Sequence, residues 1–307
     1  MRYNRLMEHM VSEGGLVIFN PTAGRGKAGK RKEEAQAHLG PAFEWVPTQR
    51  PGHATELARA GAKKHELVVA FGGDGTVGDV MRGILQAKND GDAPHEATLG
   101  IIPVGTGNDM ARNLKLVLET REACATILGG VTTRIDVGLI NGTPFINNAG
   151  TGFDAAVMHT MNTGIKFASG QLAFRLAILK TLAKYKPFAL TIEADDGEKR
   201  QMRAFMVSVL NGKVYAAGME AAPHAEVDDG RLDVMIIKEM SKLKLLPVIQ
   251  LVASGKHLDH PAVEMLQVRK LKVGTIPPQP LNIDGEVRGL TPMNIEVRPR
   301  EIKVLVR

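Results

Sequence analysis

The segment LVVAFGGDGT, from Leu67 to Thr76, constrains the fold more than any other stretch of the chain. Its five unbroken apolar residues predict a strand that is buried on both faces, as strands of parallel sheets are. Three glycines around Asp74 follow, and glycine permits positive φ and lets a ligand approach the bare backbone. Apolar residues at helical spacing between Val77 and Lys88 predict a helix after this loop, whose first N–H groups would suit a phosphate.

Asp74 is the unusual residue of this loop, because a carboxylate beside a phosphate repels it. The repulsion is relieved if Asp74 contacts a Mg²⁺ ion or accepts the proton of an attacking hydroxyl group. A tight turn with a capping aspartate is the alternative. One glycine-rich loop does not decide between these interpretations.

Two further segments repeat the order strand, small-residue loop, helix. Residues 16–19 precede NPTAGRG (20–26) and a predicted helix at 28–39, and residues 99–104 precede GTGND (105–109) and a helix beginning near Met110. This alternation predicts a parallel sheet with helices on its faces. Ligands of such sheets bind at the carboxyl ends of the strands, where all three loops would lie. Together the loops predict a ligand that carries phosphate.

The pattern changes near residue 131. Predicted strands at 134–140 and 144–148 flank Asn141-Gly142, and predicted strands at 188–194 and 200–210 flank the loop 195–197, as is typical of hairpins. Further strands are predicted at 232–238, 268–273, 281–283, 294–297 and 302–306. The second half is therefore predicted to be mainly antiparallel β, as a sandwich, with helical segments at 155–185 and 242–254.

Composition narrows the class of protein. The single cysteine, Cys124, fits a reducing compartment, and neither a membrane-spanning run nor an apolar signal core is evident, so we expect a cytoplasmic protein. The net charge of +6 comes without arginine clusters interleaved with aromatics, so a nucleic-acid partner is not expected. A basic surface would suit nucleotides or anionic lipid.

Five motifs in order give the chain a family resemblance: NPTAG (20–24), GGDGT (72–76), PVGTGND (103–109), IDVG (135–138) and DGE (284–286). Over nearly its whole length the chain resembles the soluble bacterial lipid kinases of the diacylglycerol kinase catalytic-domain family, and more distantly sphingosine and ceramide kinases. The resemblance implies an N-terminal α/β ATP-binding domain (1–131), a β-sandwich lipid-substrate domain (132–294) and an active site between them. It also implies that about residues 295–307 return to the first domain.

The resemblance also implies which residues contact ATP. One departure is Gly78-Asp79, where the family usually has Asn-Glu, which puts the hydrogen bonds around the phosphates in question. The implied ATP contacts are Asn20, Pro21, Thr22, Ala23, Gly24, Thr48, Gly72, Gly73, Gly75, Thr76, Asp79, Gly105, Thr106, Asn108 and Asp109.

Acidic residues supply the implied catalytic and metal sites. Asp284 and Glu286 fall in the motif where the family has its general base, and an extended segment would turn both to one face. A plain Asp-Gly turn is the alternative. The loop 226–231 resembles a second, structural Mg²⁺ site, with a carboxylate from Asp229 and backbone carbonyls from Glu226 and Arg231. A solvated turn is the alternative there.

The implied reaction is in-line transfer of the γ-phosphoryl group of ATP to a lipid hydroxyl, with Mg²⁺ as cofactor and diacylglycerol as the leading acceptor by analogy. Asp74 either holds the Mg²⁺–ATP or takes the hydroxyl proton, and Asp284 or Glu286 takes the other role. An NAD kinase that shares the GGDGT loop is one alternative. A non-catalytic nucleotide- or lipid-binding protein is another.

A lipid acceptor implies transient binding at the inner face of the membrane. Leucines of the 155–185 segment with Lys180 and Lys184 nearby would suit an interfacial helix, although packing on the sheet is the alternative. A homodimer is the default expectation for the oligomeric state. The leucines concerned are Leu172, Leu176, Leu179 and Leu182, with Phe174, Arg175 and Lys186 close by.

Overall fold

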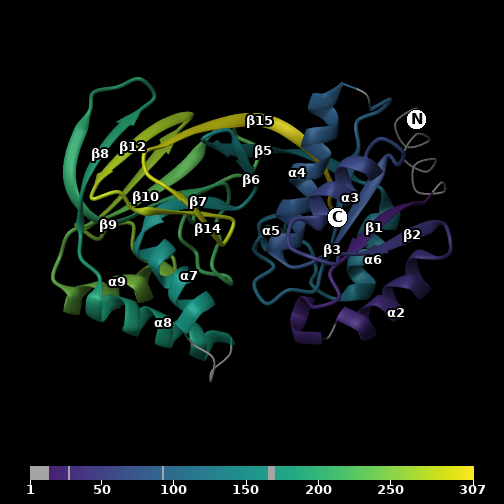
Figure 1. Cartoon of the computed structure of the whole chain (residues 1–307), viewed down its shortest axis with the longest axis horizontal. Coiled ribbons are helices and arrows are strands. Elements are labelled where there is room, and N and C mark those ends of the chain that lie inside the picture. Colours follow the sequence, from purple (N-terminus) through teal and green to yellow (C-terminus); the bar gives the residue numbers. More distant parts are fainter. Residues whose placement is uncertain (1–13, 27, 92, 165–169) are drawn as a thin grey trace. The chain divides into compact units, whose positions relative to one another are not determined.

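The computed structural model describes residues 14–26, 28–91, 93–164 and 170–307 (Figure 1). The chain divides into two compact units. The first comprises the described residues up to Ile135 together with Arg300–Arg307, and the second is Asp136–Pro299. Within the described residues, no helix has both the length and the apolar character needed to cross a membrane.

Unit 1 contains a parallel sheet, as the strand–helix alternation predicted. Its strand order is β2-β1-β3-β4, and every pair in this order is parallel. The C-terminal part of β15 (Met293–Leu305) joins β4 in parallel, with Val304 opposite Leu99. The other strands are β1 (Gly15–Phe19), β2 (Phe43–Pro47), β3 (Leu67–Gly72) and β4 (Thr98–Pro103).

Helices cover both faces of this sheet. The helices α2 and α6 pack on one face, in a core cluster that includes Val69, Ile102 and Ile127. The helices α3 and α4 pack against each other on the opposite face, where Gly61 lies against Leu16. Helical segments of this unit are η1 (Ala23–Gly26), α2 (Ala28–Leu39), α3 (His53–Gly61), α4 (Asp74–Asp90), α5 (Asp109–Asn113) and α6 (Thr120–Gly129).

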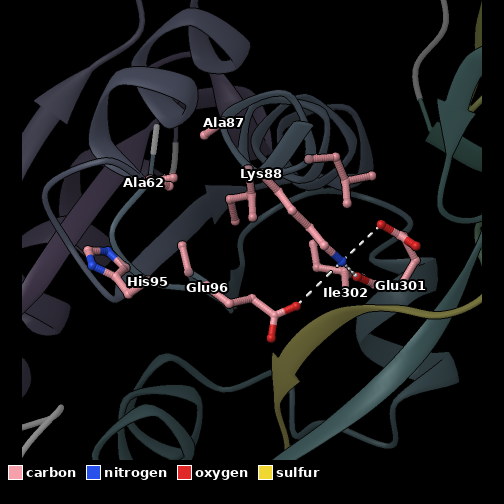
Figure 2. A pocket seen from close by; sticks show the side chains of 11 residues that line it. Ala62, Ala87, Lys88, His95, Glu96, Glu301 and Ile302 are labelled. Atoms are coloured by element: carbon pink, nitrogen blue, oxygen red, sulfur yellow. Dashed lines mark hydrogen bonds and ion pairs between the residues drawn. The ribbon is translucent and has the colours of Figure 1, made fainter. Parts of the chain in front are cut away.

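The last strand is fixed to unit 1 by ion pairs at the end of α4. Figure 2 shows Lys88 reaching between two carboxylates, with its Nζ 3.0 Å from Glu301 Oε1 and 3.5 Å from Glu96 Oε1. The cavity beside them measures about 10 Å³. That is room for about one water molecule, so this cavity is no nucleotide site.

Unit 2 is the predicted β-sandwich. Its core cluster unites residues such as Phe145, Leu190, Val207 and Ile295 from facing strands. In the strand order β14-β13-β7-β9-β8-β12-β15 every neighbouring pair is antiparallel, and β10 joins β9 and β11. The strands are β5 (Thr132–Ile140), which begins in unit 1, β6 (Thr143–Phe145), β7 (Asn148–Gly152), β8 (Phe188–Ala194), β9 (Arg200–Leu210), β10 (Leu232–Lys238), β11 (Val263–Val268), β12 (Lys270–Ile276), β13 (Pro280–Ile283) and β14 (Glu286–Leu290).

Three helices, α7 (Phe153–Gly164), α8 (Gly170–Lys184) and α9 (Lys242–Ala253), form a second core cluster of this unit with strands β9 and β10. Leu182 is buried there, whereas Leu179 is half exposed. The side chains of Leu172, Phe174 and Arg175 lie outside those that the structure describes.

Several element boundaries differ from the predicted ones. The helix near Met110 is only the five residues of α5, because positive φ at Lys115 ends the helical path, and α6 follows separately. The predicted strand at 144–148 is divided between β6 and β7, and the predicted strands at 294–297 and 302–306 are one continuous β15. Asn141-Gly142 forms the predicted two-residue hairpin, with positive φ at both residues and Ile140 opposite Thr143.

Candidate active site

The three predicted phosphate loops begin side by side at one edge of unit 1. The strands β1, β3 and β4 are adjacent and parallel, so their carboxyl ends share that edge. Hydrogen bonds continue past the strand ends: Asn20 N donates to the carbonyl of Phe71 at 3.1 Å, and Val104 N donates to the carbonyl of Gly72 at 2.9 Å. Thr48 follows β2 at the same edge, and its N–H donates to Phe19 O at 2.9 Å. Sequence reasoning placed these loops together correctly.

Two of the loops contact each other through bare backbone. A Cβ placed on Gly105 would lie 2.5 Å from the Cα of Gly73 and 2.9 Å from Asn108 Oδ1. Only glycine allows this approach at 105. In the same segment, Asn108 has φ 53°, and its side chain accepts from Gly105 N at 2.8 Å and donates to Gly105 O at 3.0 Å.

Gly105→Ala is therefore expected to displace both loops. If these loops bind the phosphates of ATP, as the resemblance implies, a shift of about 1 Å can cost roughly tenfold to hundredfold in rate, and we expect kcat/KM for ATP to fall by that amount. Gly129→Ala is the matched control, because a Cβ there meets nothing within 4 Å. Steady-state kinetics with varied ATP measure the effect, and equal kinetics for the two variants would contradict it.

Asp74 is the first residue of α4 and lies over the start of α5. Its Oδ1 accepts a hydrogen bond from Met110 N at 3.2 Å. Burial raises the pKa of Asp74, and the N–H groups at Asn108, Asp109 and Met110 oppose that shift. The carboxylate thus joins the loop after β3 to the loop after β4.

Other predicted ATP contacts shape the loops with their side chains. Asn20 Oδ1 accepts from Thr22 N at 3.0 Å and from its hydroxyl at 2.8 Å. Asp79 accepts from Arg82 at 2.8 Å and from the hydroxyl of Thr55 at 3.3 Å, which ties α4 to α3. Asp79, which stands where the family usually has the longer glutamate, therefore makes a contact between helices α4 and α3.

Asp284 occupies a turn, so the predicted extended geometry is wrong. Asp284 and Gly285 have φ values of 48° and 87°, and Ile283 lies opposite Glu286 across the β13–β14 hairpin. The Asp284 carboxylate is buried and accepts N–H bonds from three successive residues: Ile146 at 3.1 Å, Asn147 at 2.9 Å and Asn148 at 3.2 Å. These donors fix one orientation of the carboxylate.

Glu286 has a different environment. Its side chain is 43% exposed and pairs with Arg288 on the same strand. The two acids of the DGE motif therefore differ in burial and partners, and only Asp284 is held by the backbone.

The loop 226–231 is connected to Asp284 through hydrogen bonds inside unit 2. Asp136 Oδ2 accepts from Gly230 N at 2.6 Å, and Asn211 Nδ2 donates to the carbonyls of Asp136 at 2.8 Å and Ile146 at 3.0 Å. Ile146 in turn donates to Asp284. Sequence reasoning missed Asn211, because nothing local marks a single asparagine as buried.

The predicted metal loop contains one constrained carboxylate. Asp229 Oδ1 accepts from Arg231 N at 2.9 Å. Nearby, burial raises the pKa of Asp233 to about 6, and the charge of Asp229 adds to this rise. Across the described residues, no three His, Cys, Asp or Glu side chains gather into a metal cage. Mg²⁺ often uses only one or two carboxylates with phosphates and water, so Asp74 and Asp229 keep the donor chemistry that this ion needs.

Asp154 is a second candidate that sequence reasoning missed. It follows the glycine-rich strand β7 at the start of α7, where its Oδ1 accepts from Ala155 N at 2.7 Å. Its Oδ2 lies 3.4 Å from Ser208 Oγ and from Asn282 Nδ2. Burial raises the pKa of Asp154 to about 6. The GTGFD sequence at 150–154, another glycine-rich strand end followed by a helix, is the signal that could have found it.

This pKa predicts a pH-dependent stability difference for Asp154→Asn. A carboxyl group whose pKa is raised on folding from 3.8 to about 6 destabilises the folded state as pH rises through that window. Relative to wild type, Asp154→Asn should therefore gain about 2–3 kcal/mol in unfolding free energy between about pH 4 and pH 7.5. Denaturant unfolding of both proteins at the two pH values measures this gain, and parallel pH profiles would contradict it.

Two family models together match both units of the chain. The diacylglycerol kinase catalytic domain matches residues 15–140, and the YegS C-terminal NAD kinase beta sandwich-like domain matches residues 147–306. These matches define a kinase, and the chain belongs to the diacylglycerol kinase catalytic-domain family. It is an ATP-dependent lipid kinase.

Individual relatives agree with this family over almost the whole length. The diacylglycerol kinase of Bacillus subtilis (strain 168) is 31% identical over 94% of this chain and 95% of its own length. That of Staphylococcus saprophyticus subsp. saprophyticus is 32% identical over 94% of this chain and 93% of its own. A crystal structure of a protein from Bacillus anthracis str. Sterne is 26% identical, with a TM-score of 0.76 over 96% of this chain and 97% of that one.

Proposed function

We propose that this kinase phosphorylates diacylglycerol and forms phosphatidic acid. The observation that carries the proposal is that relatives named diacylglycerol kinase align across both units, not only across the phosphate loops. In the proposed reaction the acceptor hydroxyl oxygen bonds to the γ-phosphorus of ATP. The bond from that phosphorus to the β–γ bridging oxygen breaks, ADP leaves, and a carboxylate takes the hydroxyl proton.

The loops of unit 1 are proposed to bind the triphosphate. The loops after β1, β3 and β4 offer glycines and backbone N–H groups at one sheet edge, where phosphates commonly bind. Their rigid contacts through Gly73, Gly105 and Asn108 support a preorganised site. The full set is the one that the resemblance implies, from Asn20 to Asp109.

Asp74 and Asp284 are proposed to divide the two acidic roles. Asp74 lies among the phosphate loops, which suits contact with the nucleotide and its metal ion. Asp284 is fixed by three backbone N–H groups, which suits a base that must hold one orientation toward a hydroxyl. Glu286, paired with Arg288 at the surface, is the second choice for the base.

Mg²⁺ is proposed as the cofactor. Bound ion would neutralise charge on the phosphate oxygens during transfer. The Asp74 carboxylate would hold it beside ATP. The Asp229 carboxylate, with the carbonyls of Glu226 and Arg231, would hold a second, structural ion.

We also propose a cytoplasmic location with transient binding to the inner face of the membrane, because a diacylglycerol acceptor resides in a bilayer. A homodimer is the oligomeric state that we propose by default.

The experiment that tests the acceptor is a comparison of Mg²⁺-dependent ADP release with four acceptors. Diacylglycerol in mixed micelles is expected to give the highest kcat/KM, above phosphatidylglycerol, a sphingoid base and soluble NAD. Preferential turnover of one of the other lipids would replace the proposed substrate. Turnover with NAD alone would contradict the lipid acceptor itself.

A further inference from the structure

The helix α9 has an unusual composition for a helix at a protein surface. Apart from Lys242, Lys244 and Gln250, all of its side chains are apolar. One side of the helix belongs to the core of unit 2, where Leu245, Val248 and Val252 are buried. A surface helix ordinarily carries mostly polar residues opposite its buried stripe, whereas α9 has only the exposed Gln250 there among mainly apolar side chains.

The outward side of α9 is apolar as well, apart from Gln250. Leu243 is 86% exposed, more than any other large hydrophobic side chain in the described part of the chain. Pro247 is exposed too, and Leu246 and Ile249 are only partly covered by the core. A helix that is apolar on most of its circumference is normally buried in protein or in contact with lipid. The described residues of unit 2 leave this side uncovered.

Lysines border this apolar side. Lys242 Nζ donates to Ala183 O at 2.9 Å, which places the start of α9 beside the end of α8 (Figure 1). Leu179 of α8 is 51% exposed. Lys184, Lys186 and Lys244 are exposed and form no ion pair with a described residue, while the nearby Glu239 is bound to Arg203 at 2.5 Å. The α8–α9 surface consists of Leu179, Lys184, Lys186, Lys242, Leu243 and Lys244.

We propose that the α8–α9 surface docks on an anionic bilayer, with the outward side of α9 lying in the lipid interface. Exposed leucines bordered by lysines are the composition of interfacial helices, and the lysines complement anionic headgroups. The same lysines argue against a second copy of this chain as the occupant, because two such surfaces would oppose like charges. The proposal rests on the proposed function in one respect, that the acceptor lipid lies in a bilayer.

This docking surface extends the prediction from sequence. The 155–185 segment alone suggested an interfacial helix, and the segment 242–254 carried no such expectation. Only the structure brings Lys242 and Leu243 next to the end of α8.

Sedimentation with vesicles tests the proposal. The full chain should bind phosphatidylglycerol-containing vesicles more strongly than pure phosphatidylcholine vesicles, and added salt should weaken binding. Leu243→Asp should lower the partition coefficient roughly tenfold. Lys184→Glu with Lys244→Glu should lower it by at least about fivefold for each lysine. The matched control is Leu128→Asp, because Leu128 is an exposed leucine of α6 in unit 1.

Wild-type binding by Leu243→Asp, or an equal loss in Leu128→Asp, would overturn the proposal. The proposal would also be overturned if sedimentation velocity showed a wild-type dimer that the Leu243→Asp substitution dissociates. The surface would then serve self-association. Thermal unfolding checks that each variant is folded.

Activity on short-chain diacylglycerol in detergent micelles separates this inference from the proposed function. Leu243→Asp should keep wild-type turnover in micelles and lose it on vesicles. A wild type that binds anionic vesicles yet phosphorylates no diacylglycerol would contradict the proposed function and leave the docking surface standing.

Discussion

Replacing Asp74 by asparagine is expected to lower turnover by roughly 10²–10⁴-fold while the fold stays intact. Asparagine keeps a side-chain oxygen that accepts the N–H of Met110, so the link between the two phosphate loops survives. The negative charge needed to hold a metal ion or to take a proton is lost. Initial rates at saturating ATP and lipid measure the effect, and thermal unfolding verifies the fold.

Asp90→Asn is the matched control for this prediction. Asp90 lies at the other end of α4 and pairs with Arg59 and Lys63 at the surface, away from the loops. Its replacement should leave turnover within about twofold of wild type, because surface ion pairs contribute little. If Asp74→Asn were as active as Asp90→Asn, Asp74 would have no chemical role.

Asp284→Asn is expected to have the second-largest effect, a loss of roughly 10²-fold or more in kcat. Asparagine tolerates the left-handed φ of 48° at this turn, and its oxygen can still accept from the N–H groups of Asn147 and Asn148. Its amide nitrogen cannot accept, so the N–H of Ile146 loses its acceptor. Asp284→Ala, in contrast, leaves buried N–H groups without an acceptor. Each such group costs about 1–3 kcal/mol, so we expect a clearly lowered Tm for alanine and a smaller decrease in Tm for asparagine.

Glu286→Gln separates the two acids of the DGE motif. Its side chain is 43% exposed and paired with Arg288, so we expect a change in kcat of less than about tenfold. A loss in Glu286→Gln that exceeds the loss in Asp284→Asn would reverse the assignment of the base.

The phosphate-loop edge of unit 1 was predictable because local signals agree there. Apolar runs predict the strands, and glycines predict the loops after them. Because strands that alternate with helices form a parallel sheet, all these loops are expected at one edge of the sheet. Residues as distant in the chain as Asn20 and Asn108 could therefore be assigned to the same edge from sequence. What sequence could not supply is the close contact between Gly73 and Gly105. That contact depends on the packing of two loops rather than on either alone.

The DGE motif shows why the second half was harder to predict. Asp-Gly fits both an extended strand and a two-residue turn, and pairing of β13 with β7 and β14 selects the turn. The β13–β14 hairpin is local, but the β13–β7 pairing joins residues more than a hundred positions apart. For the same reason the burial of Asp154 and Asn211 is invisible locally, since it depends on strands brought together by the sandwich. The roles of these residues in catalysis stay predictions.

The central claim is phosphoryl transfer from ATP to diacylglycerol, and label transfer tests it most directly. With γ-labelled ATP, Mg²⁺ and diacylglycerol in mixed micelles, we predict labelled phosphatidic acid in equal amounts with ADP, and almost none with Asp74→Asn. ADP release without labelled lipid, or equal label transfer by wild type and Asp74→Asn, would contradict the account.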